Sequence, residues 1–231
     1  MEILNIDTQS WQLNFSLNKD LIADTNIDYL KLSENLLQVA LLNRQAEIII
    51  TDKRQKHLNQ NYYYFPQGVF YLFDKATTEI LGKPEFKLVF DDELNKNKYQ
   101  IGLAYRSDWY PTPNVISFAN DVHTICGGSL VDGILEGLIT SCKKYVKENK
   151  MLTFKIKPKK FFNGLIVVCA VRGDNFHYGG SFKETLENDE VKKQAKKVIA
   201  KLVSDFFKNN KENAEKFLWR FDTTQLTSGI Y

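Results

Sequence analysis

The order of apolar and polar residues predicts a chain that mixes strands with helices. Residues 11–17 alternate apolar and polar side chains, as a strand with one buried face does. Residues 164–172 are almost wholly apolar, which is typical of a strand buried on both faces. Shorter runs rich in β-branched or aromatic residues predict further strands at 47–52, 62–65, 85–90, 98–106 and 114–121.

Several other segments carry apolar residues at helical spacing. The clearest is a long amphipathic helix that follows the glycine pair at 127–128, with Ser129 as its expected cap. Residues 189–208 and 28–43 predict two further helices, while residues 67–81 fit either a helix or a strand. Antiparallel hairpins combined with at least one strand–helix–strand unit predict an α+β fold.

The connections are polar or rich in glycine. Residues 53–61 and 91–97 are expected turns, and residues 173–186 form a loop that contains glycine and aromatic residues. Residues 211–231 are weakly patterned, and their aromatic side chains are candidates for docking on the rest of the chain.

Composition describes an ordinary globular chain. It has 231 residues, of which 43% are hydrophobic and 26% charged. No apolar run approaches the roughly 18 residues that a membrane helix needs, so no membrane partner is expected. Three widely spaced cysteines fit a reducing compartment, and the expected location is the cytoplasm.

Charge is distributed unevenly along the chain. Residues 1–100 hold 11 basic and 14 acidic residues, whereas residues 101–231 hold 20 basic and 14 acidic ones. Residues 143–160 contain eight lysines and one acid, Glu148, which indicates either a phosphate-binding surface or a solvated helix end and hairpin. The candidate DNA contacts are Lys143, Lys144, Lys147, Lys157, Lys159 and Lys160.

Motifs for chemistry are missing from the sequence. The two Gly-Gly stretches match neither a P-loop nor a dinucleotide fingerprint, and no Gly-x-Ser-x-Gly elbow occurs. The three histidines lie in different segments. We therefore expect no catalytic residue and no metal site, and an unrelated hydrolase or transferase finds no acid–base or nucleophile set here.

Three segments carry a recognisable series of motifs. In residues 28–54, a helix with a Leu-Asn end precedes a strand that ends in Asp-x-Arg. In residues 116–138, a strand ends in Phe-x-Asn, a threonine follows, and Gly-Gly opens a long helix. From residue 164, a Gly-Leu strand leads through a loop to a lysine, a leucine and a Glu-Val helix start. The matching residues are Leu42, Asn43, Asp52, Arg54, Phe118, Asn120, Thr124, Gly127, Gly128, Gly164, Leu165, Lys183, Leu186, Glu190 and Val191.

Read in this order, the three segments resemble the second, or transducer, domain of bacterial DNA gyrase B and its topoisomerase IV counterpart. The resemblance covers roughly residues 11–210. It implies a fold of the ribosomal protein S-five domain-two type over residues 1–210, with residues 211–231 as a tail. It also implies a role in relaying nucleotide state from an ATP-binding domain to DNA gating.

The resemblance assigns a role to one loop. The family's loop lysine reaches the γ-phosphate held by the neighbouring domain, and that lysine corresponds to Lys183, preceded here by Ser181 and Phe182. ATP and Mg would therefore be bound only through a partner ATP-binding domain, and the isolated chain is expected to be inactive. The implied partners are gyrase or topoisomerase subunits and DNA, the latter without sequence preference.

Departures from the family pattern leave a second function open. Ser181 and Phe182 replace a Gln-Thr pair, and Leu130 replaces a histidine. Lys159 and Lys160 lie in the segment before the Gly-Leu strand, which is usually acidic in the family. The resemblance does not extend to the family's ATP-binding domain. The alternative is a stand-alone mimic of gyrase B that binds and regulates a topoisomerase or another ATPase.

Overall fold

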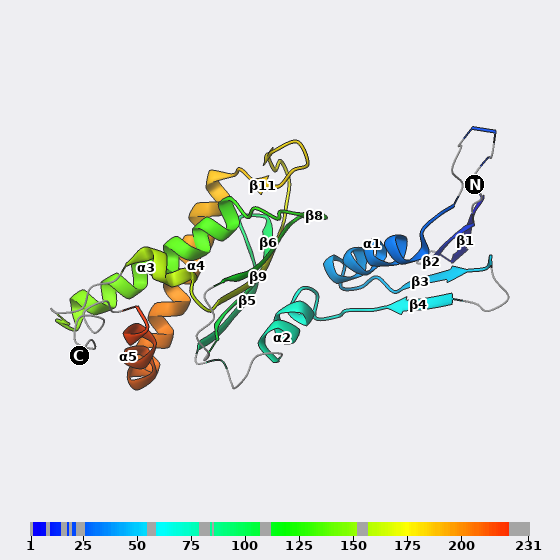
Figure 1. Cartoon of the computed structure of the whole chain (residues 1–231). Coiled ribbons are helices and arrows are strands. Elements are labelled where there is room, and N and C mark those ends of the chain that lie inside the picture. The colour runs from blue at the N-terminus through cyan, green and yellow to red at the C-terminus, as the bar shows by residue number, and fades with distance from the viewer. Residues whose placement is uncertain are drawn as a thin grey trace. The chain divides into compact units, whose positions relative to one another are not determined.

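The computed structural model describes residues 2–7, 10–14, 18, 20–21, 26–54, 59–78, 84, 86–106, 112–151 and 157–221. Packing divides the chain into two compact units (Figure 1). The first contains Met1–Leu37 and Ile48–Tyr63, and the second contains Gln38–Glu47 and Tyr64–Tyr231. The expected boundary at residue 210 remains a prediction.

The first unit combines two antiparallel hairpins with most of one helix. Strands β1 (Glu2–Asp7) and β2 (Ser10–Asn14) form one hairpin, and β3 (Ile48–Asp52) and β4 (Asn59–Tyr63) form the other. Helix α1 (Tyr29–Leu42) begins where the side chain of Asp28 accepts hydrogen bonds from the backbone N–H groups of Leu30 and Lys31. Residues 15–17 of the expected first strand lie outside the described residues.

Hydrogen bonds join α1 to the β3–β4 hairpin. The hydroxyls of Ser33 and Tyr63 lie 2.6 Å apart, and the side-chain amide of Asn61 donates to Ser33. Residues 59–61 were expected in a turn but belong to β4, because Asn59, Gln60 and Asn61 pair with Asp52, Thr51 and Ile50. Because these side chains are polar, a search for alternating apolar residues does not detect this strand.

The second unit is built on a five-stranded mixed sheet with the order β5-β6-β9-β7-β8. Its strands are β5 (Phe86–Leu94), β6 (Asn97–Tyr105), β7 (Asn114–Ala119), β8 (Val122–His123) and β9 (Leu165–Arg172). Among the strand pairs that the described residues form in this sheet, only β7–β9 is parallel, and helix α3 (Ser129–Glu148) lies in the connection between those two strands.

The hairpin between β5 and β6 is longer than expected. The sequence predicted a turn over residues 91–97, but the strands pair as far as Leu94 and Asn97. The turn consists of Asn95 and Lys96, which both have positive φ, of 47° and 69°. Two-residue hairpin turns adopt this geometry because it matches the twist of the strands.

Helices cover both faces of this sheet. Helix α2 (Phe70–Thr78) packs on one face, which confirms a helix in the ambiguous segment 67–81. Helices α3, α4 (Asp189–Asn209) and α5 (Lys211–Trp219) lie on the other face with the short 3-10 helix Pro158–Phe162. The fold is therefore a mixed α+β fold in which a mixed sheet is packed against helices.

Strand β9 is buried on both faces, as its apolar run predicted. Leu165, Val167 and Cys169 join the core on the α3–α4 face, whereas Ile166 and Val168 join the core on the α2 face. Burial raises the pKa of the Cys169 thiol to about 12. That cysteine is therefore an uncharged core residue at neutral pH.

Helices α3 and α4 run parallel and approach each other closely. A side chain at Gly133 would meet the carbonyl oxygen of Lys192, and one at Gly137 would meet that of Lys196. Ser141, four residues further along α3, donates a hydrogen bond to the carbonyl of Ala200. Small residues at every fourth position of α3 therefore allow the two backbones to come together.

Helix α5 docks through an aromatic cluster. Phe217 stacks on Phe86 with ring centroids 4.4 Å apart, and Phe221 stacks on Phe161 at 4.1 Å. The side chains of Phe217, Leu218 and Phe221 are almost fully buried. The described part of the C-terminal segment is thus a core element of the second unit, and residues 222–231 lie outside the described residues.

Candidate functional site

Residues 173–186 form a loop that closes in a small hairpin. Strands β10 (Tyr178–Gly179) and β11 (Thr185–Leu186) pair antiparallel, and residues 180–184 connect them. The sequence predicted only an irregular loop here, because two-residue strands leave no hydrophobic pattern.

Backbone hydrogen bonds hold this hairpin against the start of α3. The N–H of Cys126 donates to the carbonyl of Glu184, and the N–H of Leu186 donates to the carbonyl of Gly127. Gly128 has a φ of 97°, and a Cβ there would lie 2.3 Å from the carbonyl oxygen of Leu186. The glycine pair therefore permits the close approach of the hairpin to the helix start.

Lys183 lies in the connecting turn of the hairpin and is exposed, as are Ser181 and Phe182. The backbone of Lys183 is in the left-handed region, with a φ of 59°. Its Nζ lies 5.4 Å from the centre of the Tyr178 ring, which is a cation–π distance. Phe182 is 86% exposed at the tip.

Tyr178 connects the hairpin to the sheet. Its hydroxyl donates a hydrogen bond of 3.0 Å to the carbonyl of Ala119, the last residue of β7. Partial burial raises the pKa of Tyr178, and the nearby charge of Asp121 raises it further. The phenol is therefore a neutral donor at physiological pH. The sequence showed only an aromatic residue before a glycine pair, which does not reveal this role.

Acidic side chains surround the start of α3 and α4. A shallow depression is lined by Gly128, Ser129, Asp132, Thr185, Leu186, Glu187, Asp189 and Lys192. Ser129 was expected to cap α3, but Gly128 occupies the cap position and Ser129 is the first helical residue, whose hydroxyl accepts a hydrogen bond from the N–H of Asn188. Within the described ranges, no three His, Cys, Asp or Glu side chains converge on a possible metal position.

The candidate DNA-binding lysines come together at the other end of α3. Lys143, Lys144 and Lys147 are exposed on its last turns, and Lys157 and Lys159 are exposed at the neighbouring 3-10 helix. Lys160 is only partly exposed. Lys144 forms an i,i+4 ion pair with Glu148 at 3.7 Å, and exposed pairs of this kind contribute little to stability.

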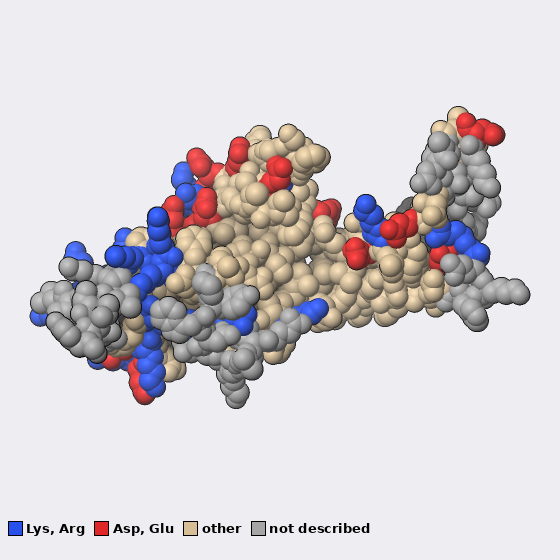
Figure 2. Space-filling model, viewed as in Figure 1, with Lys and Arg blue, Asp and Glu red and all other residues tan. Residues whose placement is uncertain are grey.

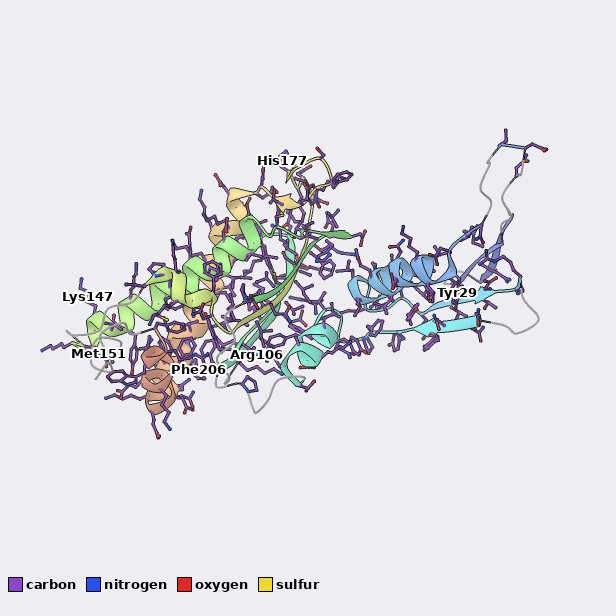
Figure 3. All side chains as sticks on the ribbon, in the orientation of Figure 1. Tyr29, Arg106, Lys147, Met151, His177 and Phe206 are labelled. Carbon is purple, nitrogen blue, oxygen red and sulfur yellow. The ribbon has the colours of Figure 1, made fainter. Side chains whose placement is uncertain are left out.

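Acidic and basic side chains gather at opposite ends of helices α3 and α4. Figure 2 shows acidic side chains gathered near the hairpin and mostly basic ones toward the other end of the helices. In Figure 3, His177 marks the hairpin loop and Lys147 marks the opposite end of α3. The 20 residues of α3 span about 30 Å, so the hairpin and the basic surface are two separate features of one unit.

A further polar feature lies in the first unit. The guanidinium of Arg54 forms two hydrogen bonds with the buried carboxylate of Asp52, at 2.9 and 2.7 Å. These bonds lower the pKa of Asp52 to about 2. Asp28, Asn59 and the pair itself line a shallow depression. The pair fixes the end of β3 rather than forming an acid–base set.

Comparison with solved structures identifies the class of fold. The chain superimposes with a TM-score of 0.71 on a structure described as the ATP-binding domain of Francisella tularensis topoisomerase IV, at 20% identity. That match covers 88% of this chain and 55% of the other. The 43K ATPase domain of Thermus thermophilus gyrase B also gives 0.71, at 15% identity, with coverages of 91% and 57%. The chain therefore shares the fold of a little over half of each of these two structures.

Sequence comparison identifies the family. A family model described as DNA gyrase B matches residues 65–225, well over half of the chain, so the chain belongs to the DNA gyrase B family. DNA gyrase B of Streptococcus pneumoniae is 26% identical over 218 residues, and that of Streptococcus pyogenes is 27% identical over 220. Each match covers 92% of this chain, which spans about a third (33%) of these relatives. Among the described residues, no helix is both long and apolar enough for a membrane span.

Proposed function

We propose that this chain is a gyrase-B-type transducer of a type II DNA topoisomerase, with a fold of the ribosomal protein S-five domain-two type. The observation that carries the proposal is the hairpin: Lys183 is exposed at its turn, and backbone hydrogen bonds fix that turn to the start of α3. A rigidly mounted ammonium on a flexible stem is suited to reading a terminal phosphate. Membership of the DNA gyrase B family supports the type II topoisomerase part of this proposal.

In this function the chain contributes no complete active site of its own. ATP and Mg would be held by a partner ATP-binding domain, and Lys183 would contact the γ-phosphate presented by that partner. Helices α3 and α4 are parallel and both start beside the hairpin, so a contact at the hairpin would act on both helices. Nucleotide state would then bias how the chain is arranged against its partners.

The test is nucleotide-dependent association. The chain and the gyrase-B-type ATP-binding domain of the same organism are mixed with and without a non-hydrolysable ATP analogue, and their affinity is measured by calorimetry. We expect the analogue to strengthen binding in the unmodified chain and in Lys96→Met but not in Lys183→Met. Lys96 is a matched control, because it is also exposed in a hairpin turn with a positive φ of 69°. Equal nucleotide dependence in both variants would reject the sensing role.

The basic surface supports sequence-independent DNA binding as a second part of this function. Five exposed lysines and the partly exposed Lys160 lie at the α3 end and at the 3-10 helix. Lysine contacts to phosphates position a protein on DNA without reading its sequence. Binding to two duplexes of unrelated sequence should therefore have equal affinity in a fluorescence anisotropy titration.

One observation favours the alternative function of a stand-alone mimic that regulates a topoisomerase or another ATPase. Phe182, which is 86% exposed, occupies a position where the family resemblance implies a threonine. An aromatic residue at a hairpin tip is suited to protein contact rather than to phosphate contact. Capture of an intact gyrase subunit from lysate, with equal yield in the presence and absence of nucleotide, would support this alternative over the transducer.

A further inference from the structure

Three contacts of Tyr178 join the hairpin turn to the sheet. Its ring lies 5.4 Å from the Nζ of Lys183, and its hydroxyl donates to the carbonyl of Ala119. Its backbone pairs with Leu186 in the β10–β11 hairpin. The side chain therefore touches both the exposed lysine and the end of strand β7.

The end of β7 is itself tied to the neighbouring strand. Asn120, which follows Ala119, donates its N–H to the carbonyl of Val171. Its side chain exchanges two hydrogen bonds of 3.0 Å with the backbone of Gly173, at the start of the hairpin loop. A displacement of Tyr178 therefore acts on a hydrogen-bonded junction between β7, β9 and the loop.

We propose that Tyr178 is a positioning residue for Lys183: its ring holds the ammonium group, and its hydroxyl transmits the position of the lysine to the β7–β9 junction. This inference rests on the proposed function and adds a residue to its sensing hairpin. The backbone of Lys183 lies in the left-handed region, which glycine or asparagine adopts more readily. Lys96 and Lys150 share this backbone conformation, so the role of Tyr178 rests on its side-chain contacts and not on the φ of Lys183.

The proposed role implies two states of the Lys183 side chain. In the first, its charge faces the Tyr178 ring, as in this structure. In the second, an anionic phosphate attracts the ammonium away from the ring, because charge–charge attraction exceeds the attraction of an aromatic face. Leaving the ring removes one of the groups that hold Tyr178, and the hydroxyl bond to Ala119 passes the change to the sheet.

The first experiment measures the ring contact in the full chain. Lysines are dimethylated with ¹³C-labelled formaldehyde, and the signal of Lys183 is assigned by its loss in Lys183→Arg. We expect an upfield ring-current shift of this signal in the unmodified chain and in Tyr178→Phe, and its loss in Tyr178→Leu. Lys87, whose Nζ lies 5.0 Å from the centre of the Phe73 ring, serves as an internal reference that stays shifted throughout. An unchanged Lys183 signal in Tyr178→Leu would overturn the proposal.

The second experiment measures transmission through the hydroxyl. Amide chemical shifts of Asn120 and Gly173 are compared before and after Lys183→Met, first in the unmodified chain and then in Tyr178→Phe. We expect the substitution to shift both amides only where the hydroxyl is present. Shifts of equal size in both backgrounds, or none in either, would refute transmission. Tyr178→Phe removes one oxygen atom and retains the ring, so this comparison stays valid if Tyr178→Leu does not fold.

These outcomes are separate from those of the proposed function, because both experiments use the chain without nucleotide or partner. If Lys183→Met keeps the nucleotide dependence in calorimetry while the ring-current shift is present, phosphate sensing is rejected and the Tyr178 contact remains supported. If Lys183→Met abolishes the nucleotide dependence but the Lys183 signal does not depend on the Tyr178 ring, phosphate sensing is retained and Tyr178 has no part in it.

Discussion

Gly128 determines how closely the hairpin can approach helix α3. Its φ of 97° disfavours any side chain, and a Cβ would also lie 2.3 Å from the carbonyl oxygen of Leu186. We predict that Gly128→Ala lowers the free energy of unfolding by about 2–5 kcal/mol. The loss combines a backbone conformation (φ 97°, ψ −149°) that essentially only glycine adopts with the forced displacement of the hairpin. Urea denaturation followed by circular dichroism measures the loss.

Gly127 provides the matched control. Its φ of 73° is also positive, and the three atoms nearest to a Cβ there all belong to the side chain of Val131, at 3.2 to 3.6 Å. Gly127→Ala should therefore cost less than Gly128→Ala, about 1–2 kcal/mol, because no backbone atom is among these three neighbours. Equal losses at the two positions would mean that the contact with Leu186 does not restrict the hairpin.

The ion pair of Asp52 and Arg54 predicts a pH dependence of the first unit. Hydrogen bonds from Arg54 lower the pKa of Asp52 to about 2, whereas an unfolded aspartate titrates near about 3.9. The folded state therefore releases this proton more readily, and the stabilisation is complete above about pH 5 and lost as the pH falls toward 2. Hydrogen exchange of β3 amides between pH 2 and pH 6 should show this loss in the unmodified chain. A similar pH dependence in Asp52→Asn would contradict the assignment to this carboxylate.

At the scale of elements, helix α5 depends on aromatic packing rather than on its own sequence. Phe217 is 1% exposed and lies within ring-contact distance of Phe86, Tyr105, Phe207 and Phe221. Phe217→Ala should destabilise the second unit by about 3–5 kcal/mol, because it leaves a cavity in a cluster that cannot collapse. Thermal unfolding measures this loss. Trp219, on the same helix but 47% exposed, is the control, and its replacement by alanine should cost clearly less.

The sequence predicted those elements whose own residues carry a strong pattern. Helix α3 buries Leu130, Ile134 and Leu138 on one face, and β9 is apolar at nearly every position, so both were located correctly. Helix α5 buries only Ala214, Phe217 and Leu218, and most of its ring partners come from β5, β6 and α4. Periodicity within a short segment does not contain that information.

The candidate site was accessible to sequence reasoning only in part. Lys183 was found through the family motif, and the structure places it at a hairpin turn. Tyr178 was not found, because its contacts with Lys183 and Ala119 arise when the loop folds back on the sheet. Glu136 joins α3 to α4 through ion pairs with Lys192 and Lys196, and neither helix pattern indicates this contact. Such cross-element contacts depend on packing that a linear pattern does not show.

At the scale of the second unit, the hairpin and the basic surface lie at opposite ends of α3, about 30 Å apart along the helix. Part of the charge separation has a structural origin, because acids favour helix N-termini and lysines favour C-termini. Asp189 and Glu190 occupy the first turn of α4, and Lys147 lies in the last turn of α3. The lysines of the 3-10 helix lie outside α3 and α4, and they enlarge the basic surface beyond what the ends of these helices need.

DNA binding through this surface should depend steeply on salt. Up to six lysine–phosphate contacts predict a slope of log K against log salt near about −5 for duplex DNA, because each contact releases about 0.9 counterion. The triple variant Lys143→Gln, Lys147→Gln and Lys159→Gln should reduce the slope by about 3. Fluorescence anisotropy across a salt series measures both values.

A control with equal charge loss separates a defined surface from general attraction by net charge. Lys96, Lys98 and Lys193 are also exposed, but Lys193 lies near the start of α4, and the turn that carries Lys96 contacts that end through Asn95 and Glu190. Replacing these three by glutamine lowers the net charge equally. If the basic surface binds the phosphates, this variant keeps nearly the full slope. Equal reductions in the two triple variants would show that DNA responds to total charge, and the surface at the end of α3 would then not be a binding site.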